Sequence, residues 1–312
     1  IFADNKISVR SNISGKYNGV IKIKDSEFIE DNDNTQSFVL AGDSLFMYNV
    51  TFSKSNVDNI PLMFNKYIEL KKCNFIDIKQ KSSIILSNAD SASVDSCVFR
   101  GCKGNGLLSE SKSIQVSNSI FESNEVYDVF FATVDCDAYL YRNTFSNNIT
   151  SSSVVHSAKK VTMCNNTVTG NTAKNVLLLE NKQSILNNNT IVGNTSSYSI
   201  KCNDIIFGGN ILLANGDGSV FNAFETSQFI DNIMPPAVWG DRLFDFTGNL
   251  IIEDTDTQYE VSSEIFEGEQ TKEGFVPTLK DNGGFTPTVA LKSDKLSDGK
   301  SIRFPRLENV LT

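Results

Sequence analysis

The stretch Ala138-Tyr-Leu-Tyr-Arg-Asn-Thr-Phe145 is matched in pattern by Val161-Thr-Met-Cys-Asn-Asn-Thr-Val168 and by Ser184-Ile-Leu-Asn-Asn-Asn-Thr-Ile191. The last residues of these three segments are 23 positions apart. Equivalent anchor residues recur at intervals of 22 to 24 residues from Phe28 through Phe52, Phe75, Phe99 and Phe121 to Phe145, and Leu212 follows Ile191 after 21. A fixed period of this length indicates a solenoid of stacked coils.

Within each repeat, apolar residues stand seven and five positions before the anchor, as Ala138 and Leu140 do before Phe145. Two such positions separated by one residue predict a strand with one buried face. The anchor has the opposite parity, so a two-residue corner such as Asn187-Asn188 must intervene. A third short apolar strand, for example Val129-Phe-Phe131, precedes each pair. We therefore predict an all-β, right-handed parallel β-helix with about nine or ten coils of roughly 23 residues.

Two files of asparagines follow the same period. The first, two residues before the anchor, comprises Asn143, Asn166, Asn189 and Asn210, and the second, three residues after it, comprises Asn124, Asn148, Asn171, Asn194 and Asn215. We expect the first file to stack its amides from coil to coil and the second to bond locally to turn backbone. Cys73 and Cys97 occupy the first file in earlier coils, where a small apolar residue also fits. Both files are interpreted as structure.

The composition limits the class of protein. Of 312 residues, 40% are hydrophobic and 21% charged, a balance that supports a folded core. The formal net charge of −9 disfavours nucleic acid and anionic membranes as partners, and the sequence contains no apolar run long enough for a transmembrane segment. The six cysteines include no Cys-x-x-Cys pair, so no metal or cofactor is predicted, while disulfides and buried free thiols both remain open.

Residues 1–215 are predicted to form the regular coils. Residues 216–312 should hold a long excursion around Pro235-Pro236 and Trp239, one last coil with Phe244, Phe246, Asn249 and Ile251, and an irregular C-terminal cap from about Glu264. We expect this region to pack on the helix as part of one structural domain. A cap is expected because an open end of the helix exposes unpaired strand backbone.

The run Asp281-Asn-Gly-Gly-Phe-Thr-Pro-Thr-Val-Ala-Leu291 resembles the end of the choice-of-anchor Q β-helix proteins, which are bacterial surface or secreted proteins often found in Bacteroidetes. The rest of the chain resembles the general pectate-lyase-like coil. Asp294-Lys-Leu-Ser-Asp298 departs from the Ser-Pro-Ala-Ile-Asp that often follows in that family. The resemblance implies an extracellular or cell-surface location in a bacterium and specifies no reaction.

The pectate-lyase-like resemblance suggests polysaccharide chemistry to look for. The Asp-Asp, Gly-His-Gly and Arg-Ile-Lys strings of polygalacturonases do not occur. A lyase needs a cation, such as Lys, Arg or bound Ca²⁺, to neutralise a uronate, and a basic side chain to remove a proton. The candidate catalytic residues are Asp135, Asp137, Arg142, Lys159 and Lys160. Because Lys159 follows Asp135 by 24 residues, we expect an ion pair between them, which at a solvated surface contributes under about 1 kcal/mol.

Aromatic residues offer candidate ligand contacts. Tyr127, Phe131, Tyr139 and Tyr141 fall within two coil faces and would suit stacking on sugar rings, although aromatics of a β-helix also serve as core residues. His156, the only histidine, has no obvious partner in the sequence and is interpreted as a packed or surface side chain.

Consecutive apolar residues in the third strand suggest that both of its faces are buried. We expect the segment from Gly216 onward, or another protein, to cover the outer face. The leading hypothesis is a secreted or cell-surface scaffold, adhesin-like or glycan-contacting and non-catalytic, whose partner is a polysaccharide or a glycan or protein of a host or cell surface. The alternative is a polysaccharide lyase or glycoside hydrolase of the pectate-lyase-like type.

Overall fold

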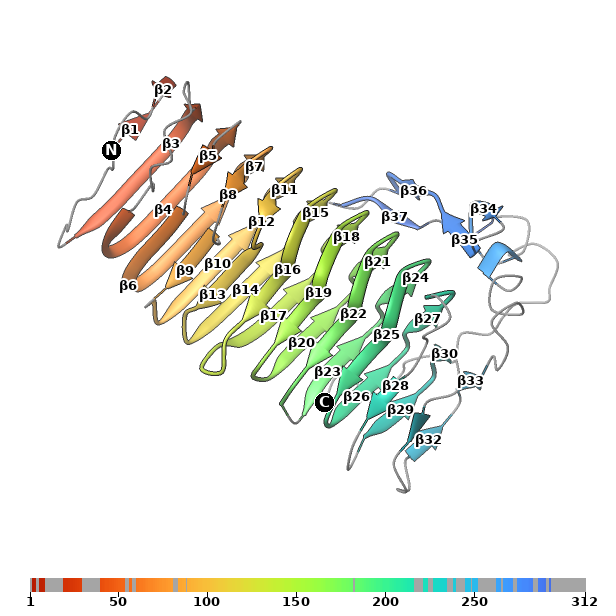
Figure 1. Cartoon of the computed structure of the whole chain (residues 1–312). Coiled ribbons are helices and arrows are strands. Elements are labelled where there is room, and N and C mark those ends of the chain that lie inside the picture. Colours follow the sequence, from red (N-terminus) through yellow and green to blue (C-terminus); the bar gives the residue numbers. More distant parts are fainter. Residues whose placement is uncertain are drawn as a thin grey trace.

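The computed structural model describes residues 2–3, 6–8, 19–29, 40–53, 56–57, 60–80, 84–87, 89–181, 183–215, 221–223, 227–234, 238–239, 245–247, 249–251, 262–264, 266–271, 274–282, 286–289 and 292. The strands β1 to β33 form a right-handed parallel β-helix, in which each coil pairs in parallel with the coils before and after it (Figure 1). The pairing continues around the corners between the three faces of the rod. The register links Phe28 in turn to Phe52, Phe75, Phe99, Phe121, Phe145, Val168, Ile191 and Leu212. The predicted fold class and repeat are confirmed.

Each regular coil contributes strands to three faces of the rod. The first sheet contains β10 (Ser91–Asp95), β14 (Ser113–Ser117), β17 (Asp137–Tyr141), β20 (Val161–Cys164), β23 (Ser184–Asn187), β26 (Ile205–Gly208), β29 (Gln228–Ile230) and β32 (Asp245–Thr247). The second sheet contains β7 (Asn74–Ile76), β11 (Val98–Arg100), β15 (Ile120–Glu122), β18 (Thr144–Ser146), β21 (Thr167–Thr169), β24 (Thr190–Val192), β27 (Ile211–Leu213), β30 (Ile233–Met234) and β33 (Leu250–Ile251).

The third sheet contains β5 (Asn56–Val57), β8 (Lys79–Gln80), β9 (Ile84–Ser87), β12 (Lys103–Gly104), β13 (Leu107–Glu110), β16 (Glu125–Ala132), β19 (Ile149–Ser157), β22 (Thr172–Leu179), β25 (Thr195–Cys202), β28 (Phe221–Ala223) and β31 (Val238–Trp239). Near the N-terminus, strands run through the corners and join two or three sheets: β3 (Val20–Ile29), β4 (Leu40–Ser53) and β6 (Ile60–Lys71). The short strands β1 (Phe2–Ala3) and β2 (Lys6–Ser8) both pair with β3.

The corners on either side of the second sheet turn through one residue with positive φ. The corner before it uses Asp25, Asn49, Lys72, Ser96, Asn118, Arg142, Asn165, Asn188, Gly209 and Asp231, and the corner after it uses Asp77, Gly101, Ser123, Asn147, Gly170, Gly193 and Ala214. Asn, Asp and Gly recur there because they enter the left-handed region at least cost. The predicted two-residue corner is therefore confirmed, and the residue after each of these positive-φ positions lies in the column that one of the asparagine files occupies in later coils.

Both asparagine files are buried ladders that bond across coils. Asn166 donates from Nδ2 to Asn189 Oδ1 at 2.9 Å and to Leu140 O at 2.9 Å, as predicted for the first file. That ladder extends further than predicted, through Asn232 to Asn249. The second file was expected to bond locally to turn backbone, and this was wrong for its main interaction. Its side chains also point inward and bond from coil to coil.

Asn148 shows the second ladder. Its Nδ2 donates to Asn171 Oδ1 at 2.8 Å and to Phe121 O at 3.0 Å, while its own Oδ1 accepts the backbone N–H of Asn124 at 3.0 Å. Only a secondary local bond remains in places, such as that from Asn171 Nδ2 to Thr169 O. Burial of these amides is tolerated because their donors and acceptors are paired.

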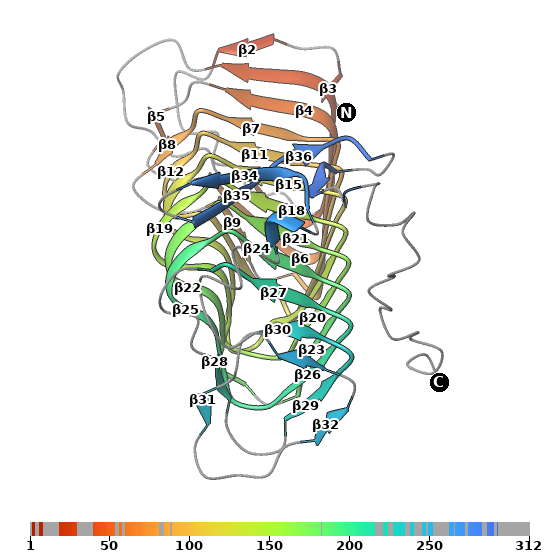
Figure 2. The same cartoon turned by 90° about the vertical axis from the view of Figure 1, so that its right-hand side faces the viewer.

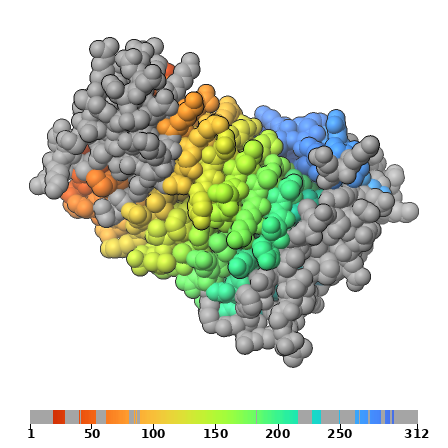
Figure 3. Space-filling model, in the orientation of Figure 1, coloured from red at the N-terminus to blue at the C-terminus, as the bar shows by residue number. Residues whose placement is uncertain are grey.

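The apolar interior forms one cluster along the rod. The third strand contributes consecutive apolar residues to it because the register shifts between Val126 and Asp128 and again between Ile149 and Ser153. Val129 with Phe130, and Val154 with Val155, are fully buried neighbours for this reason. The expectation of a covered outer face was wrong: the outward-facing side chains of Tyr127 and Ile149 are 57% and 59% exposed. Figure 3 shows this face open along the middle of the rod.

The C-terminal strands cover a different face. The strands β34 (Gly268–Thr271) and β35 (Gly274–Pro277) form one antiparallel pair, and β36 (Leu279–Lys280) and β37 (Thr288–Val289) form another. They lie beside the second sheet (Figures 1 and 2). Thr144 Oγ1 donates to Pro287 O at 2.6 Å, and Phe275 and Val289 join an apolar cluster with Val192 and Leu213. The described part of the tail thus packs along the side of the rod. The sequence had predicted a cap over an open end instead.

The predicted long excursion after Gly216 contains a further coil. β28 pairs with β25, β29 with β26, and β30 with β27, and Asn232 continues the first ladder. The last coil with Asn249 and Ile251 is confirmed, whereas Phe244, Pro235 and Pro236 lie outside the described residues. Among the described residues, no helix is long and apolar enough to cross a membrane.

Candidate ligand pocket on the third sheet

A pocket of about 260 Å³ opens on the outer face of the third sheet. Its lining comes from three successive coils and consists of Asn105, Gly106, Leu107, Leu108, Tyr127, Asp128, Phe131 and His156. These residues belong to β13, β16 and β19 and to the loop before β13. The pocket therefore lies on the face that the C-terminal strands leave uncovered.

The pocket arises because one coil is short. Four positions lead from Lys103 to Leu107, whereas five lead from their partners Glu125 to Phe130 in the next coil. The preceding coil also has five, from Lys79 to Ile84. The recess lies where this shorter coil passes, with Asn105, Gly106, Leu107 and Leu108 in its lining.

Gly106 makes this recess possible. Its N–H donates to Asp128 O at 3.0 Å, and a Cβ atom built on Gly106 would lie 2.2 Å from Val129 O and 2.3 Å from Asp128 O. No side chain fits between these backbones, so glycine is required by the close approach of the two coils.

His156 lies at one wall of the pocket between two carboxylates. Its Nδ1 is 3.2 Å from Asp128 Oδ2, and its Nε2 is 3.4 Å from Glu180 Oε2. The Asp128 side chain is held in place because its Oδ1 accepts the backbone N–H of Ser153 at 2.8 Å. The Phe131 ring stacks on the imidazole with centroids 4.4 Å apart. The interpretation of His156 as a residue without a partner was wrong.

The environment of His156 favours the imidazolium. Burial lowers the pKa of His156, but the hydrogen bonds and charges of Asp128 and then Glu180 outweigh it, so the net shift is upward from 6.5. Nδ1 is bonded to Asp128, and Nε2 is buried 3.4 Å from Glu180 Oε2 without a hydrogen bond, so neither nitrogen is accessible to take a proton from a substrate. The arrangement suits a fixed, charged wall of a binding site better than a general base.

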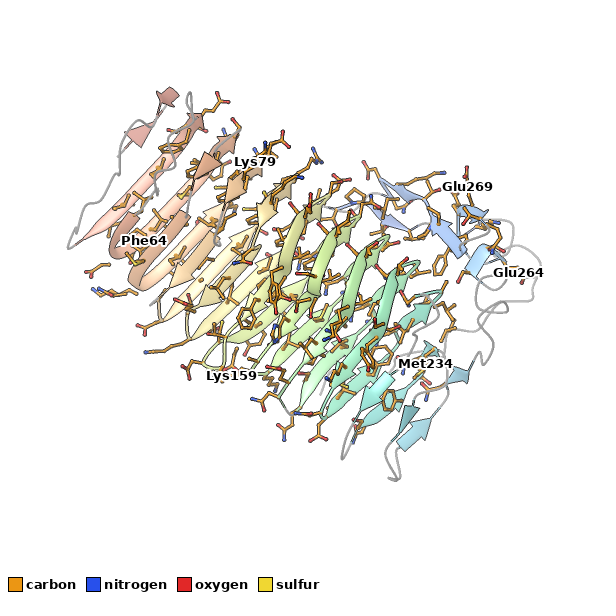
Figure 4. The ribbon with its side chains drawn as sticks, in the orientation of Figure 1. Phe64, Lys79, Lys159, Met234, Glu264 and Glu269 are labelled. Carbon is orange, nitrogen blue, oxygen red and sulfur yellow. The ribbon has the colours of Figure 1, made fainter. Side chains whose placement is uncertain are left out.

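The predicted catalytic residues lie elsewhere. Lys159 Nζ donates to Asp137 Oδ2 at 3.0 Å and to the backbone carbonyl of Asp135 at 3.2 Å, so the expected ion pair with the Asp135 carboxylate was wrong. Both side chains of the pair that does form are about one-third exposed. Lys159 lies at the edge of the rod near β20, far from Glu269 of the C-terminal strands (Figure 4). Arg142 is an exposed corner residue with a φ of 55°, and half-buried Lys160 accepts a bond from Ala138 N–H through its carbonyl.

The predicted aromatic residues divide into two groups. Tyr127 and Phe131 line the pocket. Tyr139 and Tyr141 lie on β17 of the first sheet, where their rings stack with centroids 6.5 Å apart. Sequence spacing did not separate these groups, and it did not identify Asn105, Asp128 and Glu180 as neighbours of the aromatic pair.

The cysteines are free thiols, which settles the alternative between disulfides and thiols. Burial raises the pKa of Cys102 to about 12, so this thiol stays protonated at neutral pH. Among the described residues, no group of three or more His, Cys, Asp and Glu side chains is arranged to hold a metal ion.

Comparison with known proteins agrees with the fold. Residues 2–140 match the family model described as a right handed beta helix region. No curated protein and no solved structure matches the chain. The fold is thus consistent with a pectate-lyase-like scaffold, and an assignment of function depends on the pocket.

Proposed function

We propose that this chain is a non-catalytic, glycan-contacting β-helix, adhesin-like and secreted or displayed on a cell surface, whose third-sheet pocket receives one sugar unit of a larger glycan. The observation that carries the proposal is the combination of the exposed ring of Tyr127 with the polar side chains of Asn105, Asp128 and His156 in one recess. A sugar presents C–H groups on one face and hydroxyls at its edge, which matches an aromatic surface bordered by hydrogen-bonding groups.

The size of the recess supports a single unit. Its volume of about 260 Å³ lies just below the range of about 300–1,000 Å³ that is usual for sites that enclose a drug-sized ligand. An open rod face beside it leaves room for the rest of a polymer. Tyr127 has few rotatable bonds, so fixing its ring against a sugar costs little conformational entropy.

The side-chain geometry favours binding over cleavage. Both nitrogens of His156 face carboxylates, and Lys159 is engaged by Asp137, so neither residue is placed as a free base at the pocket. The lyase or hydrolase alternative would require Asp135, Asp137, Arg142, Lys159 and Lys160 to act at a separate surface. The resemblance of Asp281–Leu291 to the tail of bacterial surface proteins supports the proposed location on a bacterium such as a member of the Bacteroidetes, with a polysaccharide or host glycan as partner.

A glycan array combined with reducing-end and unsaturated-uronate assays tests this proposal. We expect glycan binding without release of either product. Tyr127→Ala should weaken binding about tenfold, which corresponds to the loss of one aromatic contact, while Tyr139→Ala on the first sheet should leave binding unchanged. Release of new chain ends, or an equal loss in both variants, would contradict the proposal and favour the enzyme.

A further inference from the structure

The charges around the pocket do not balance. Asp128 and Glu180 supply two carboxylates, and the imidazole of His156 between them supplies at most one positive charge. Among the described residues that line the recess, none is Lys or Arg. Lys103 on the adjoining strand is engaged by Glu125, and Lys201 lies over the ring of Tyr198 with its Nζ 6.0 Å from the centroid. Even with the imidazole protonated, these three side chains keep one net negative charge at the pocket.

The wall formed by Asp128, His156 and Glu180 can accept hydrogen bonds from a ligand. Each carboxylate oxygen has two lone pairs, and Asp128 uses one oxygen toward Ser153 N–H and the other toward His156. Glu180 is about half exposed and directs one oxygen toward the imidazole. Further donors from a ligand can be accepted at both residues, whereas Nδ1 of His156 is bonded to Asp128 and Nε2 is buried, so the imidazole offers a ligand no accessible N–H.

An ammonium group matches this wall. It carries three N–H donors and no acceptor, and it is attracted by the negative face of an aromatic ring such as Tyr127 or Phe131. A uronate carboxylate would meet like charge and would find no accessible N–H on His156. A neutral sugar would stack on the aromatic surface and donate from its hydroxyls to the same carboxylates, but without the charge attraction that an ammonium group adds.

We infer that the pocket selects a sugar with a free amino group, a hexosamine unit, over neutral sugars and over uronates. This selectivity rests on the proposed glycan-contacting function, which it deepens by naming the ligand class. The negative charge at Asp128 and Glu180 is the feature that distinguishes the three sugar classes.

Titration calorimetry with oligosaccharides of equal length tests the inference. The probes are a glucosamine oligomer, the same oligomer fully N-acetylated, and an oligogalacturonate. We expect the free-amine oligomer to bind most tightly, N-acetylation to weaken binding about tenfold, and the oligogalacturonate to bind weakest. All three are measured at one pH and one salt concentration, because the whole chain carries a formal charge of −9 and attracts cations generally.

Two charge-matched variants separate the pocket from general attraction. Glu180→Gln should remove most of the preference for the free amine and leave binding of the N-acetylated oligomer unchanged. Glu122→Gln removes an equal charge from an exposed ion pair with Arg100 on β15 of the second sheet, and should leave the order of affinities intact.

The outcomes distinguish the two proposals. Equal or tighter binding of the acetylated or acidic oligomer, still weakened by Tyr127→Ala, would overturn the amine selectivity and keep the glycan-contacting function. An equal loss in Glu180→Gln and Glu122→Gln would also overturn the selectivity. Binding of none of the three oligomers would overturn the proposed function itself.

Discussion

The two halves of the rod are stabilised by different side chains at the same coil positions. In the N-terminal half, phenylalanine rings stack along the second sheet from Phe28 to Phe145, with centroids 4.7–5.2 Å apart. From Val168 onward, aliphatic residues take this position. The inward corner positions also change, from serine, cysteine and aliphatic residues in the earlier coils to asparagines in the later ones. The earlier residues are Ser26, Val50, Cys73, Cys97 and Ser119 in one column and Ile78 and Cys102 in the other. One backbone geometry is thus compatible with two kinds of interior.

The first corner column shows why both kinds fit. Cys73 N–H donates to Cys97 Sγ at 3.4 Å, Cys97 N–H to Ser119 Oγ at 3.1 Å, and Ser119 N–H to Asn143 Oδ1 at 3.0 Å. Thiol, hydroxyl and amide accept the same bond in turn. The backbone N–H of each corner donates to the side chain in the next coil, whatever that side chain is. The type of side chain sets the strength of the bond, since sulfur is a weak acceptor and donor.

The largest effect is expected from the aromatic stack. Phe99→Ala should lower the free energy of unfolding by about 3–5 kcal/mol, because it removes a buried ring between two others. Val168→Ala, at the same column in the other half, should cost about 2 kcal/mol. Urea unfolding followed by circular dichroism measures both. Equal losses would show that the stack contributes no more than an aliphatic column.

A smaller difference in the free energy of unfolding is expected within the column after the second sheet, which contains Cys102, Asn124 and Asn148. Asn148→Ala should cost about 2–4 kcal/mol because it removes the acceptor of both the backbone N–H and the side-chain amide of buried Asn124, and it removes a donor to Phe121 O. Cys102→Ala should cost about 1 kcal/mol, since the bond from its thiol to Phe75 O is long and weak. Measured in the same assay, a cost for Cys102→Ala that matches Asn148→Ala would contradict the proposed gradient of strength.

The smallest effect is expected where the two halves meet, at His156. The folded protein binds this proton more tightly than the unfolded chain, because the pKa of His156 is raised from 6.5. The stabilisation is therefore complete below about pH 6.5 and is lost as the pH rises through the folded-state pKa. The unfolding free energy of the wild type should fall across that interval relative to His156→Gln. Parallel pH profiles of the two proteins would contradict the ion pairs with Asp128 and Glu180.

Sequence periodicity predicted the features that repeat. The anchor column, the two-residue corners and both asparagine files follow from spacing, because like residues must stack when each coil has the same length. The second file was assigned the wrong bonds because its place beside a corner suggested a local turn. The coil after Gly216 was missed because Ser227 stands where the column is usually apolar.

The pocket could not be predicted in the same way, because it depends on departures from the period. His156 follows Asp128 by 28 residues, so no coil spacing brings the two together until the register shifts of β16 and β19 are known. The one sequence signal was Asn105-Gly106, since a glycine inside a strand pattern marks a bulge or a close approach of backbone. The lateral position of the C-terminal strands had no periodic signal at all.

The short coil also bears on how such a rod acquires new surfaces. Removing one residue between Lys103 and Leu107 changes the outline of one coil, while the strands before and after it keep their pairing. The same span has four positions from Lys103 to Leu107, five from Glu125 to Phe130 and six from Ile149 to Val155, so the outline of this wall changes from coil to coil. Stacked coils of this kind can diversify through length changes in individual turns, which leave the neighbouring turns in register.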